Sequence, residues 1–258
     1  MENGLILLTF KKEDNMNILS NGNNNAKTVK SNLSDLIKDL EDYFENYDKV
    51  NTGIVYFTPA SLSGKNVCGS SSPACRKACL YSAGRGKMSN VKKGRMRKTL
   101  MFLHERKKFF SELNKDIYKL KRQSAKNKAL PCIRLNGTSD IPYQNIKQGS
   151  EKQTLMEQHK DVQFYDYTKD WRRKPKTSNY HLTYSKSELH TEQDVHDMVA
   201  KGNNVAVVWR NKLPETYAGH KVFNGDDTDL RFLDPKGVVI GLIAKGEAKK
   251  DVSGFVLD

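Results

Sequence analysis

The chain has 258 residues, a formal net charge of +14 at pH 7 and a hydrophobic fraction of 37%. This length suits one large domain or two small ones, and the hydrophobic fraction is too high for a disordered chain. The apolar run "LILLTF" near the start is much shorter than a membrane span and too short for a signal-peptide core, so we expect a cytoplasmic protein without a membrane segment. The surplus of positive charge favours nucleic acid or a small anionic ligand as partner.

The beginning of the chain has little hydrophobic pattern. Residues 1–32 include the Asn-rich stretch "SNGNNN", and we expect a flexible segment there. Residues 32–47 place apolar side chains on one helical face, which predicts an N-terminal amphipathic helix. The β-rich run "TGIVYFTPAS" then predicts a strand that stops at Pro59. Residues 33–258 show no clean linker and are expected to form one domain.

Three of the four cysteines lie within residues 66–86, "NVCGSSSPACRKACLYSAGRG". Cys68, Cys75 and Cys79 have the spacing C-x6-C-x3-C, in a polar and basic loop that is poorly suited to build a core. In a reducing compartment, clustered cysteines are more often metal ligands or catalytic groups than disulfides. The loop therefore predicts a metal site on these three residues.

Two kinds of metal site fit three clustered thiols. Structural zinc usually has four ligands in closely spaced pairs, so zinc would need a distant histidine or Cys132 here. Iron–sulfur clusters are held by thiolates of variable spacing, and three cysteines would leave one iron of a 4Fe–4S cluster open or hold a 3Fe–4S form. Arg76, Lys77 and Arg85 would offset the negative charge of such a cluster. We favour the iron–sulfur cluster and keep zinc as the alternative.

A long helix is predicted from Ser89 to about Ser124. Apolar residues recur there at steps of three and four, while Lys and Arg crowd the other face. Such a basic face could contact the phosphates of nucleic acid, although a helix that packs on the core and exposes a solvated basic face is the commoner outcome. The aromatic residues of this helix fall mostly on or beside its apolar side, which favours the core over base stacking.

The second half of the chain alternates short β-rich runs with helical or polar connections. This pattern indicates a mostly parallel sheet, and with the first strand about seven strands are expected. A partial or closed (β/α) barrel is the first choice of α/β fold, and an open doubly wound sheet is the second. The six runs are "PCIRLNG", "VQFYDYT", "YHLTYS", "NVAVVW", "HKVFNG" and "VVIGLIAKG".

Polar residues gather where the predicted strands end. In parallel α/β folds the active sites lie at the carboxyl ends of the strands, so we expect these side chains and the cysteine loop to surround one mouth. Asp140, Asp166 and Asp226 are the candidate catalytic groups. The candidate ligand- and cofactor-binding residues are Asn136, Arg85, Lys169 and Lys245. Cys132 begins its strand, at the opposite edge of a parallel sheet, and is expected to be a core thiol.

The chain resembles two groups of known proteins. A cysteine loop after the first barrel strand is similar to radical S-adenosylmethionine enzymes, but their C-x3-C-x2-C spacing is not matched and Ala78 replaces the aromatic residue before the last cysteine. S-adenosylmethionine as a cofactor rests on that resemblance alone. The segments "TPASLSGKNVCGSSSPACRKACLYSAGRG", "IRLNGTSDIPY" and "FYDYTK" resemble the bacteriophage gene-product-eighty-eight family. This second resemblance implies a phage-encoded protein of the host cytoplasm with a cluster on the three cysteines.

Overall fold

The computed structural model describes residues 16–22, 47 and 49–258. Residues 32–46 of the predicted helix and most of the predicted flexible segment 1–32 lie outside the described residues. Within that segment, β1 (Ser20–Asn21) is described and pairs antiparallel with β2 (Lys49–Ile54). In the described part of the chain no helix is long and apolar enough to cross a membrane.

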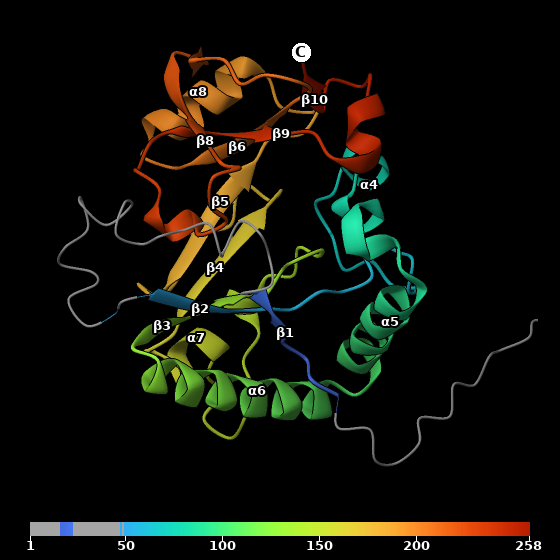
Figure 1. Ribbon diagram of the computed structural model, residues 1–258, viewed down its shortest axis with the longest axis vertical. Helices are drawn as coiled ribbons and strands as arrows, with labels where there is room; N and C mark the ends of the chain where they lie inside the picture. Colours follow the sequence, from blue (N-terminus) through green and yellow to red (C-terminus); the bar gives the residue numbers. More distant parts are fainter. Residues whose placement is uncertain (1–15, 23–46, 48) are drawn as a thin grey trace, which may run out of the picture.

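One mostly parallel sheet organises the chain (Figure 1). Its order is β1-β2-β3-β4-β5-β6-β9-β8-β7, and β10 adds to β6 in parallel. Each of the seven predicted strand runs contains or overlaps a strand of this sheet. Only the β1–β2 and β7–β8 pairs are antiparallel. The remaining strands are β3 (Ala129–Arg134), β4 (Gln163–Thr168), β5 (Tyr180–Ser185), β6 (Val205–Trp209), β7 (Thr216–Tyr217), β8 (His220–Asn224), β9 (Val239–Ile243) and β10 (Val256–Leu257).

The parallel strands from β2 to β6 neighbour one another in chain order, and β9 follows them. Among the described residues no strand pairing joins the two ends of this order, so closure into a barrel is not shown. The mixed α/β class and the mostly parallel sheet are as predicted. Because all of these strands run in one direction, their carboxyl ends lie along one edge of the sheet.

Helices fill the connections between the strands. The cysteine segment between β2 and β3 is followed by the two longest described helices, and α6 packs against β2 and β3 while α8 packs against β6 (Figure 1). The helices are α4 (Pro73–Lys77), α5 (Ser89–His104), α6 (Arg106–Lys126), α7 (Leu155–Gln158) and α8 (Glu192–Ala200), with short 3-10 turns η3 (Leu80–Ser82), η4 (Gly84–Lys87), η5 (Tyr143–Asn145), η6 (Arg231–Leu233) and η7 (Gly246–Lys250).

The prediction of a single long helix from residue 89 to 124 is wrong in one respect, because the helix is interrupted at Glu105. The backbone of Glu105 is not helical, with φ −125° and ψ 49°, and it separates α5 from α6. The break allows Phe102 of α5 to meet Phe109 of α6 edge to face, with ring centroids 5.3 Å apart. A change of helix direction thus lets both helices bury their apolar residues in one cluster.

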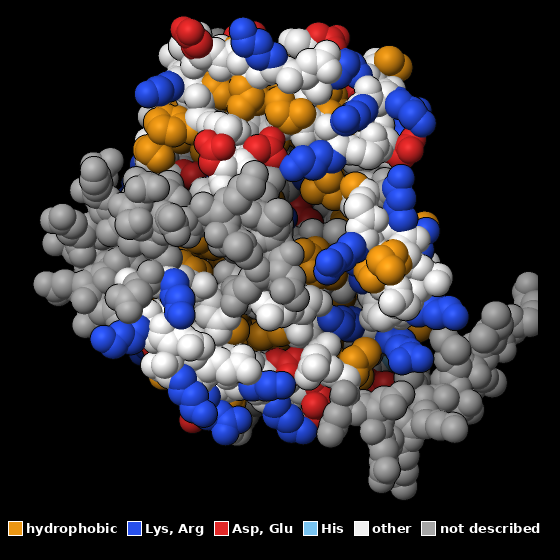
Figure 2. Space-filling model, viewed as in Figure 1, with side chains coloured by type: hydrophobic (Ala, Val, Ile, Leu, Met, Phe, Trp, Pro, Cys, Tyr) orange, Lys and Arg blue, Asp and Glu red, His pale blue; other side chains and the backbone are white. Residues whose placement is uncertain are grey.

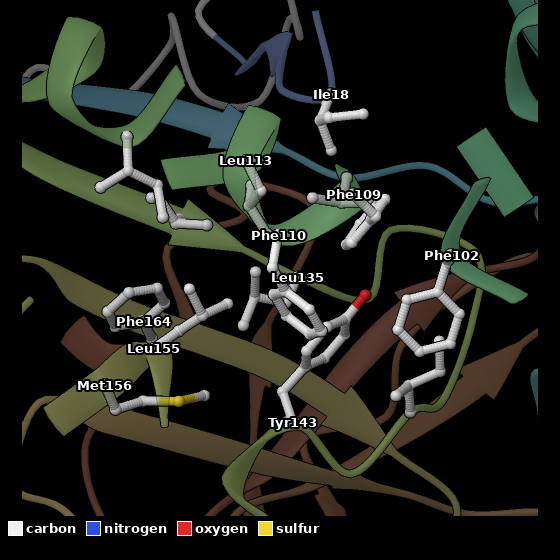
Figure 3. Packing of buried hydrophobic residues seen from close by; sticks show 14 of the residues in the cluster. Ile18, Phe102, Phe109, Phe110, Leu113, Leu135, Tyr143, Leu155, Met156 and Phe164 are labelled. Atoms are coloured by element: carbon white, nitrogen blue, oxygen red, sulfur yellow. The ribbon is translucent and has the colours of Figure 1, made fainter. Parts of the chain in front are cut away.

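The main core lies between α6 and the sheet (Figure 3). The α6 side chains that recur at three- and four-residue steps are buried there, as the sequence pattern predicts. Aromatic rings of α5, α6 and the β3–β4 connection meet in this cluster, together with Phe57 from the segment after β2. The buried residues of α6 are Phe109, Phe110, Leu113, Ile117, Leu120 and Ser124.

We predict that Phe109→Ala destabilises the fold by about 3–5 kcal/mol, the usual cost of a large aromatic-to-alanine truncation in a core. Phe109 is fully buried, and its ring centroid lies 5.6 Å from that of Phe57 and 5.4 Å from that of Phe110. Urea unfolding followed by circular dichroism measures the change. Lys119→Ala on the exposed side of α6 is the control, with an expected change under about 0.5 kcal/mol. Equal effects of the two changes would contradict this packing.

Candidate functional site

The segment after β2 carries Cys68 toward the carboxyl end of β3. The backbone N–H of Ala60 donates to Cys68 Sγ at 3.3 Å, and Asn66 Oδ1 accepts from the Cys68 backbone N–H at 2.8 Å. The next residue back, Val67, accepts at its carbonyl from the Asp140 N–H at 2.9 Å. These bonds fix the first cysteine against the turn that follows β3.

The second cysteine sits on α4, a five-residue helix. Ser72 is its N-cap and accepts from the Cys75 N–H at 3.2 Å, while Pro73 opens the helix with a φ suited to that position. Glu188, from the connection after β5, binds the same helix start. Its carboxylate accepts from Ser72 Oγ at 2.6 Å and from the Ala74 N–H at 3.0 Å. Glu188 therefore anchors the helix that carries Cys75.

The third cysteine caps the next short turn, because Cys79 Sγ accepts from the Tyr81 N–H at 3.5 Å. Cys68, Cys75 and Cys79 form no disulfide in the described part of the chain, are partly buried, and all three line one cavity of about 250 Å³. The cavity also takes in the ends of β3, β4, β5, β6 and β9. Figure 2 shows the hollowed face between the part built on β6–β9 and the part built on α4 and α5, with charged and hydrophobic side chains around it.

Burial dominates the electrostatics of the three thiols. It raises the pKa of Cys68 to about 11, and it also raises the pKa values of Cys75 and Cys79. Lys169 acts in the opposite direction on Cys75 and Cys79 because its ammonium favours the thiolate. Without a metal the three thiols are thus protonated at neutral pH, and metal binding would have to displace their protons.

Lys169 lies in the cavity wall at the carboxyl end of β4. Its Nζ donates to the Lys186 carbonyl at 2.9 Å and lies 4.8 Å from the centre of the Phe255 ring. Burial lowers the pKa of Lys169, while Cys75 and Asp140 act to raise it. An ammonium with three donors in this place suits an anionic group of a ligand.

Asn136 and Asp166, both candidates from the sequence, form a buried support below the cavity. Asp166 is fully buried and does not line the cavity. Its carboxylate accepts from the Asn136 N–H at 2.6 Å, from Asn136 Nδ2 at 2.9 Å and from Tyr180 OH at 2.9 Å. Asn136 lines the cavity, but its side chain also closes the turn onto Ile141. The structure thus places Asp166 where it holds the turn after β3.

Asp140 lines the cavity and is tied to the end of β4. Its carboxylate accepts from the Lys169 N–H at 2.8 Å, from Thr168 Oγ1 at 3.2 Å and from Arg173 Nη1 at 2.5 Å. The side chain is 9% exposed. Asp140 therefore joins two strand ends and presents little free surface to a ligand.

Asp226 and Lys245 come together across the ends of β8 and β9. Lys245 Nζ lies 2.7 Å from Asp226 Oδ1, and the Ile243 N–H donates to Asp226 Oδ2 at 2.8 Å. Both residues line the cavity, as the sequence led us to expect. Arg85 differs, because it lies in η4, is exposed and is not among the lining residues.

Cys132 is a fully buried core thiol, as predicted. It packs with Tyr165, Leu230 and Leu233 and lies outside the cavity lining. Its register partner on β2 is Thr52, well before the segment that carries the other cysteines.

Two charged lining residues, Arg134 and Asp229, were not among the candidates from the sequence. Arg134 ends β3, and its Nη1 lies 2.8 Å from Asp229 Oδ2 in the segment after β8. A basic residue at the end of an otherwise apolar strand was the available signal for Arg134. Asp229 belongs to the acidic run "DDTD", in which only tertiary contacts distinguish the members. No local sequence pattern marks Glu188, which anchors the start of α4 and is not a lining residue.

A family match covers almost the whole chain, including every residue of the cavity. Residues 17–258 match the family model described as gene product 88. The chain belongs to this family. The resemblance drawn from the cysteine loop and the strand-end segments is thereby confirmed. No curated protein and no solved structure matches the chain.

The donor set of this gene product 88 family member is not arranged around a single ion. Within the described ranges, no group of three or more His, Cys, Asp and Glu side chains is placed to hold one metal ion. A tetrahedral zinc ion needs its sulfur ligands at about 2.3 Å, so the described geometry gives no support to zinc.

We predict that Glu188→Ala exposes Cys75. Loss of both Glu188 contacts removes hydrogen bonds to a charged group, worth about 1.5 kcal/mol or more, so local opening should rise about tenfold. Iodoacetamide labelling of the metal-free protein, read by mass spectrometry, should show Cys75 reacting faster by about that factor. Cys68, whose contacts do not involve Glu188, is the internal control. Unchanged labelling of Cys75 would rule out the anchoring role.

Asp166 should make stability depend on pH. Burial raises its pKa to about 6, although Arg173 and the hydrogen bonds from Asn136 and Tyr180 act to lower it. Between its ordinary pKa of about 4 and this value, the folded state keeps a proton that the unfolded state has lost. Its contribution is therefore fully present below about pH 4 and is lost as the pH rises through about 6.

We predict that Asp166→Asn reduces the fall in the free energy of unfolding between about pH 4 and pH 6. Burial also raises the pKa of Asp234 to about 6, so a second change, Asp234→Asn, should flatten the profile further. Urea unfolding at several pH values measures the slopes. A slope that is the same in the wild type and in both variants would contradict the assignment.

Proposed function

We propose that this protein is a phage-encoded iron–sulfur protein of the host cytoplasm that holds its cluster on Cys68, Cys75 and Cys79. The observation that carries the proposal is that three cysteine thiols from one loop line the same cavity at the carboxyl edge of a parallel sheet. Functional sites of parallel α/β folds collect at this edge. A sheet that curves into a partial (β/α) barrel is the form of the fold that we propose around the cluster.

The residues present fit such a cluster. Backbone N–H groups of Ala60 and Tyr81 point at two of the sulfurs, and N–H donors to cluster ligands are among the features that set reduction potential. Lys169 supplies a buried positive charge beside Cys75, which offsets negative charge on bound thiolates. When bound, the cluster would supply one-electron exchange or, with only three protein thiolates, an open iron position.

We further propose an enzymatic or redox role on a small ligand that carries an anionic group. Lys169 and Lys245 both line the cavity, and their positive charges favour an anionic group there. Asp140 and Asp226 hold the strand ends that frame it. Because the spacing C-x6-C-x3-C departs from that of radical S-adenosylmethionine enzymes, S-adenosylmethionine stays outside the proposed cofactor set.

Alanine substitutions of the four cysteines test the cluster. After anaerobic purification, the wild type should be coloured and contain about three or four iron atoms per chain with matching sulfide. Cys68→Ala, Cys75→Ala and Cys79→Ala should each lose the cluster, read by visible absorption, electron paramagnetic resonance and iron and sulfide assays.

Cys132→Ala is the matched control for these variants, because it removes a thiol that lies in the core and outside the cavity. It should keep the wild-type spectrum and iron content. A colourless, iron-free wild type would contradict the proposal. Loss of the cluster in Cys132→Ala would mean that Cys132 is also a cluster ligand.

Nucleic-acid binding is a second candidate, carried by the net charge of +14 and the basic face of α6. Its support is weaker for two reasons. Lys108, Lys115 and Lys121 form ion pairs with nearby carboxylates, which reduces the free positive charge of that face. The phenylalanines of α5 and α6 are in the core, so they are not available to stack on bases.

A further inference from the structure

One wall of the cavity contains a pair of opposite charges that the cluster does not need. Arg134 and Asp229 are joined by a 2.8 Å contact, and their side chains are 13% and 10% exposed. The Arg134 guanidinium also lies over the Tyr167 ring, 4.8 Å from its centre. Among the described residues no hydrogen bond or ion pair links Arg134 or Asp229 to the three cysteines.

Arg134 keeps unused capacity to donate. In the described part of the structure its Nε is buried and has no hydrogen-bond partner. A buried polar group left unpaired costs about 1–3 kcal/mol, and a guanidinium presents its donors as a fork that matches a carboxylate. A ligand oxygen next to the Arg134–Asp229 pair would satisfy this donor.

The charges of the lining residues balance, although the whole chain is strongly basic. The lining contains three basic residues and three acidic ones, so its formal side-chain charge is zero before the cysteines are counted. Thiolates or a cluster would make it negative. A ligand that is only an anion would meet repulsion here, and a ligand with both charges would not. The basic residues are Arg134, Lys169 and Lys245, and the acidic residues are Asp140, Asp226 and Asp229.

The rest of the wall near the ends of β6 and β9 is apolar. Val208, Leu242, Ile243 and Ala244 line the cavity there, and Phe255 from the last turn joins them. Such a surface gains free energy by covering an apolar group of a ligand. The volume of about 250 Å³ suits a small molecule rather than a polymer.

We propose that the cavity binds a small zwitterion of the α-amino-acid type with an apolar substituent. The ligand carboxylate binds Arg134, its ammonium binds Asp229, and its substituent lies on the apolar wall. This assignment rests on the proposed function, because it names the class of ligand that the cavity brings beside the cysteines. It narrows the anionic group of that ligand to a carboxylate with an adjacent ammonium.

Three probes of matched length separate the contributions. L-norleucine carries both charges, hexanoate lacks the ammonium and n-pentylamine lacks the carboxylate. Ligand-observed magnetic resonance with the full chain should give a dissociation constant for norleucine at least about tenfold below those of the other two, since each lost charged hydrogen bond is worth about 1.5 kcal/mol or more. Equal affinities for the three, or no binding of norleucine, would overturn the proposal.

Two substitutions assign the groups. Asp229→Asn keeps the shape and should weaken norleucine and n-pentylamine about tenfold while leaving hexanoate as tight or tighter. Arg134→Gln should weaken norleucine and hexanoate and spare n-pentylamine. Lys121→Gln, on α6, breaks the ion pair with Asp161 outside the cavity and is the control that should change nothing. Should Arg134→Gln fail to fold, the selectivity of Asp229→Asn decides alone.

The binding measurements do not depend on the cluster assay. They are made on the metal-free chain and repeated after iron and sulfide are added, with the absorption spectrum recorded in parallel. Norleucine selectivity in a chain that takes up no cluster from the added iron and sulfide would refute the iron–sulfur site and keep the zwitterion site. A stable cluster with no selectivity among the probes, or with selectivity unchanged by both substitutions, would refute the zwitterion site and leave the cluster standing.

Discussion

The parallel register between β2 and β3 is the constraint on which the site depends. It pairs Ile54 with Arg134, so both strands end at the same level and their following segments must share one edge. Two backbone bonds continue the pairing beyond the strands, from the Gly137 N–H to Val55 and from the Asp140 N–H to Val67. A Cβ on Gly137 would lie 2.6 Å from the Tyr56 ring, so only glycine permits this approach. The cysteine segment is thereby held over the end of β3.

The polar residues at this edge form a rigid frame that is largely satisfied within itself. Asp166 collects three donors, and Asp140 joins the ends of β3 and β4 through Lys169 and Arg173. Groups bound in this way position their neighbours rather than meet a ligand. The groups that remain to bind a ligand or a cluster are the three thiols, the Lys169 ammonium and the Arg134–Asp229 pair.

Much of the architecture could be predicted from the sequence because it depends on local patterns. The period of the strand runs and of α6 reflects which face is buried, and the structure follows it. The break at Glu105 could not be predicted, because the pattern of apolar residues continues through it and the break serves packing of Phe102 on Phe109. The cysteine cavity was predicted from strand ends alone, whereas Arg134, Asp229 and Glu188 become neighbours of the site only through contacts distant in sequence.

By itself the sequence determined the three-cysteine loop, the parallel strands and the core position of Cys132, since each follows from spacing or periodicity along the chain. Only the tertiary structure decided which strand-end residues face the cavity. Asp166 and Tyr167 are adjacent, but side chains of a strand alternate between its faces. Asp166 therefore shares the face of Phe164, which packs in the α6 cluster, while Tyr167 reaches the cavity beside Arg134. The side of the sheet that α6 covers settles that choice, and contacts between distant segments fix where α6 packs.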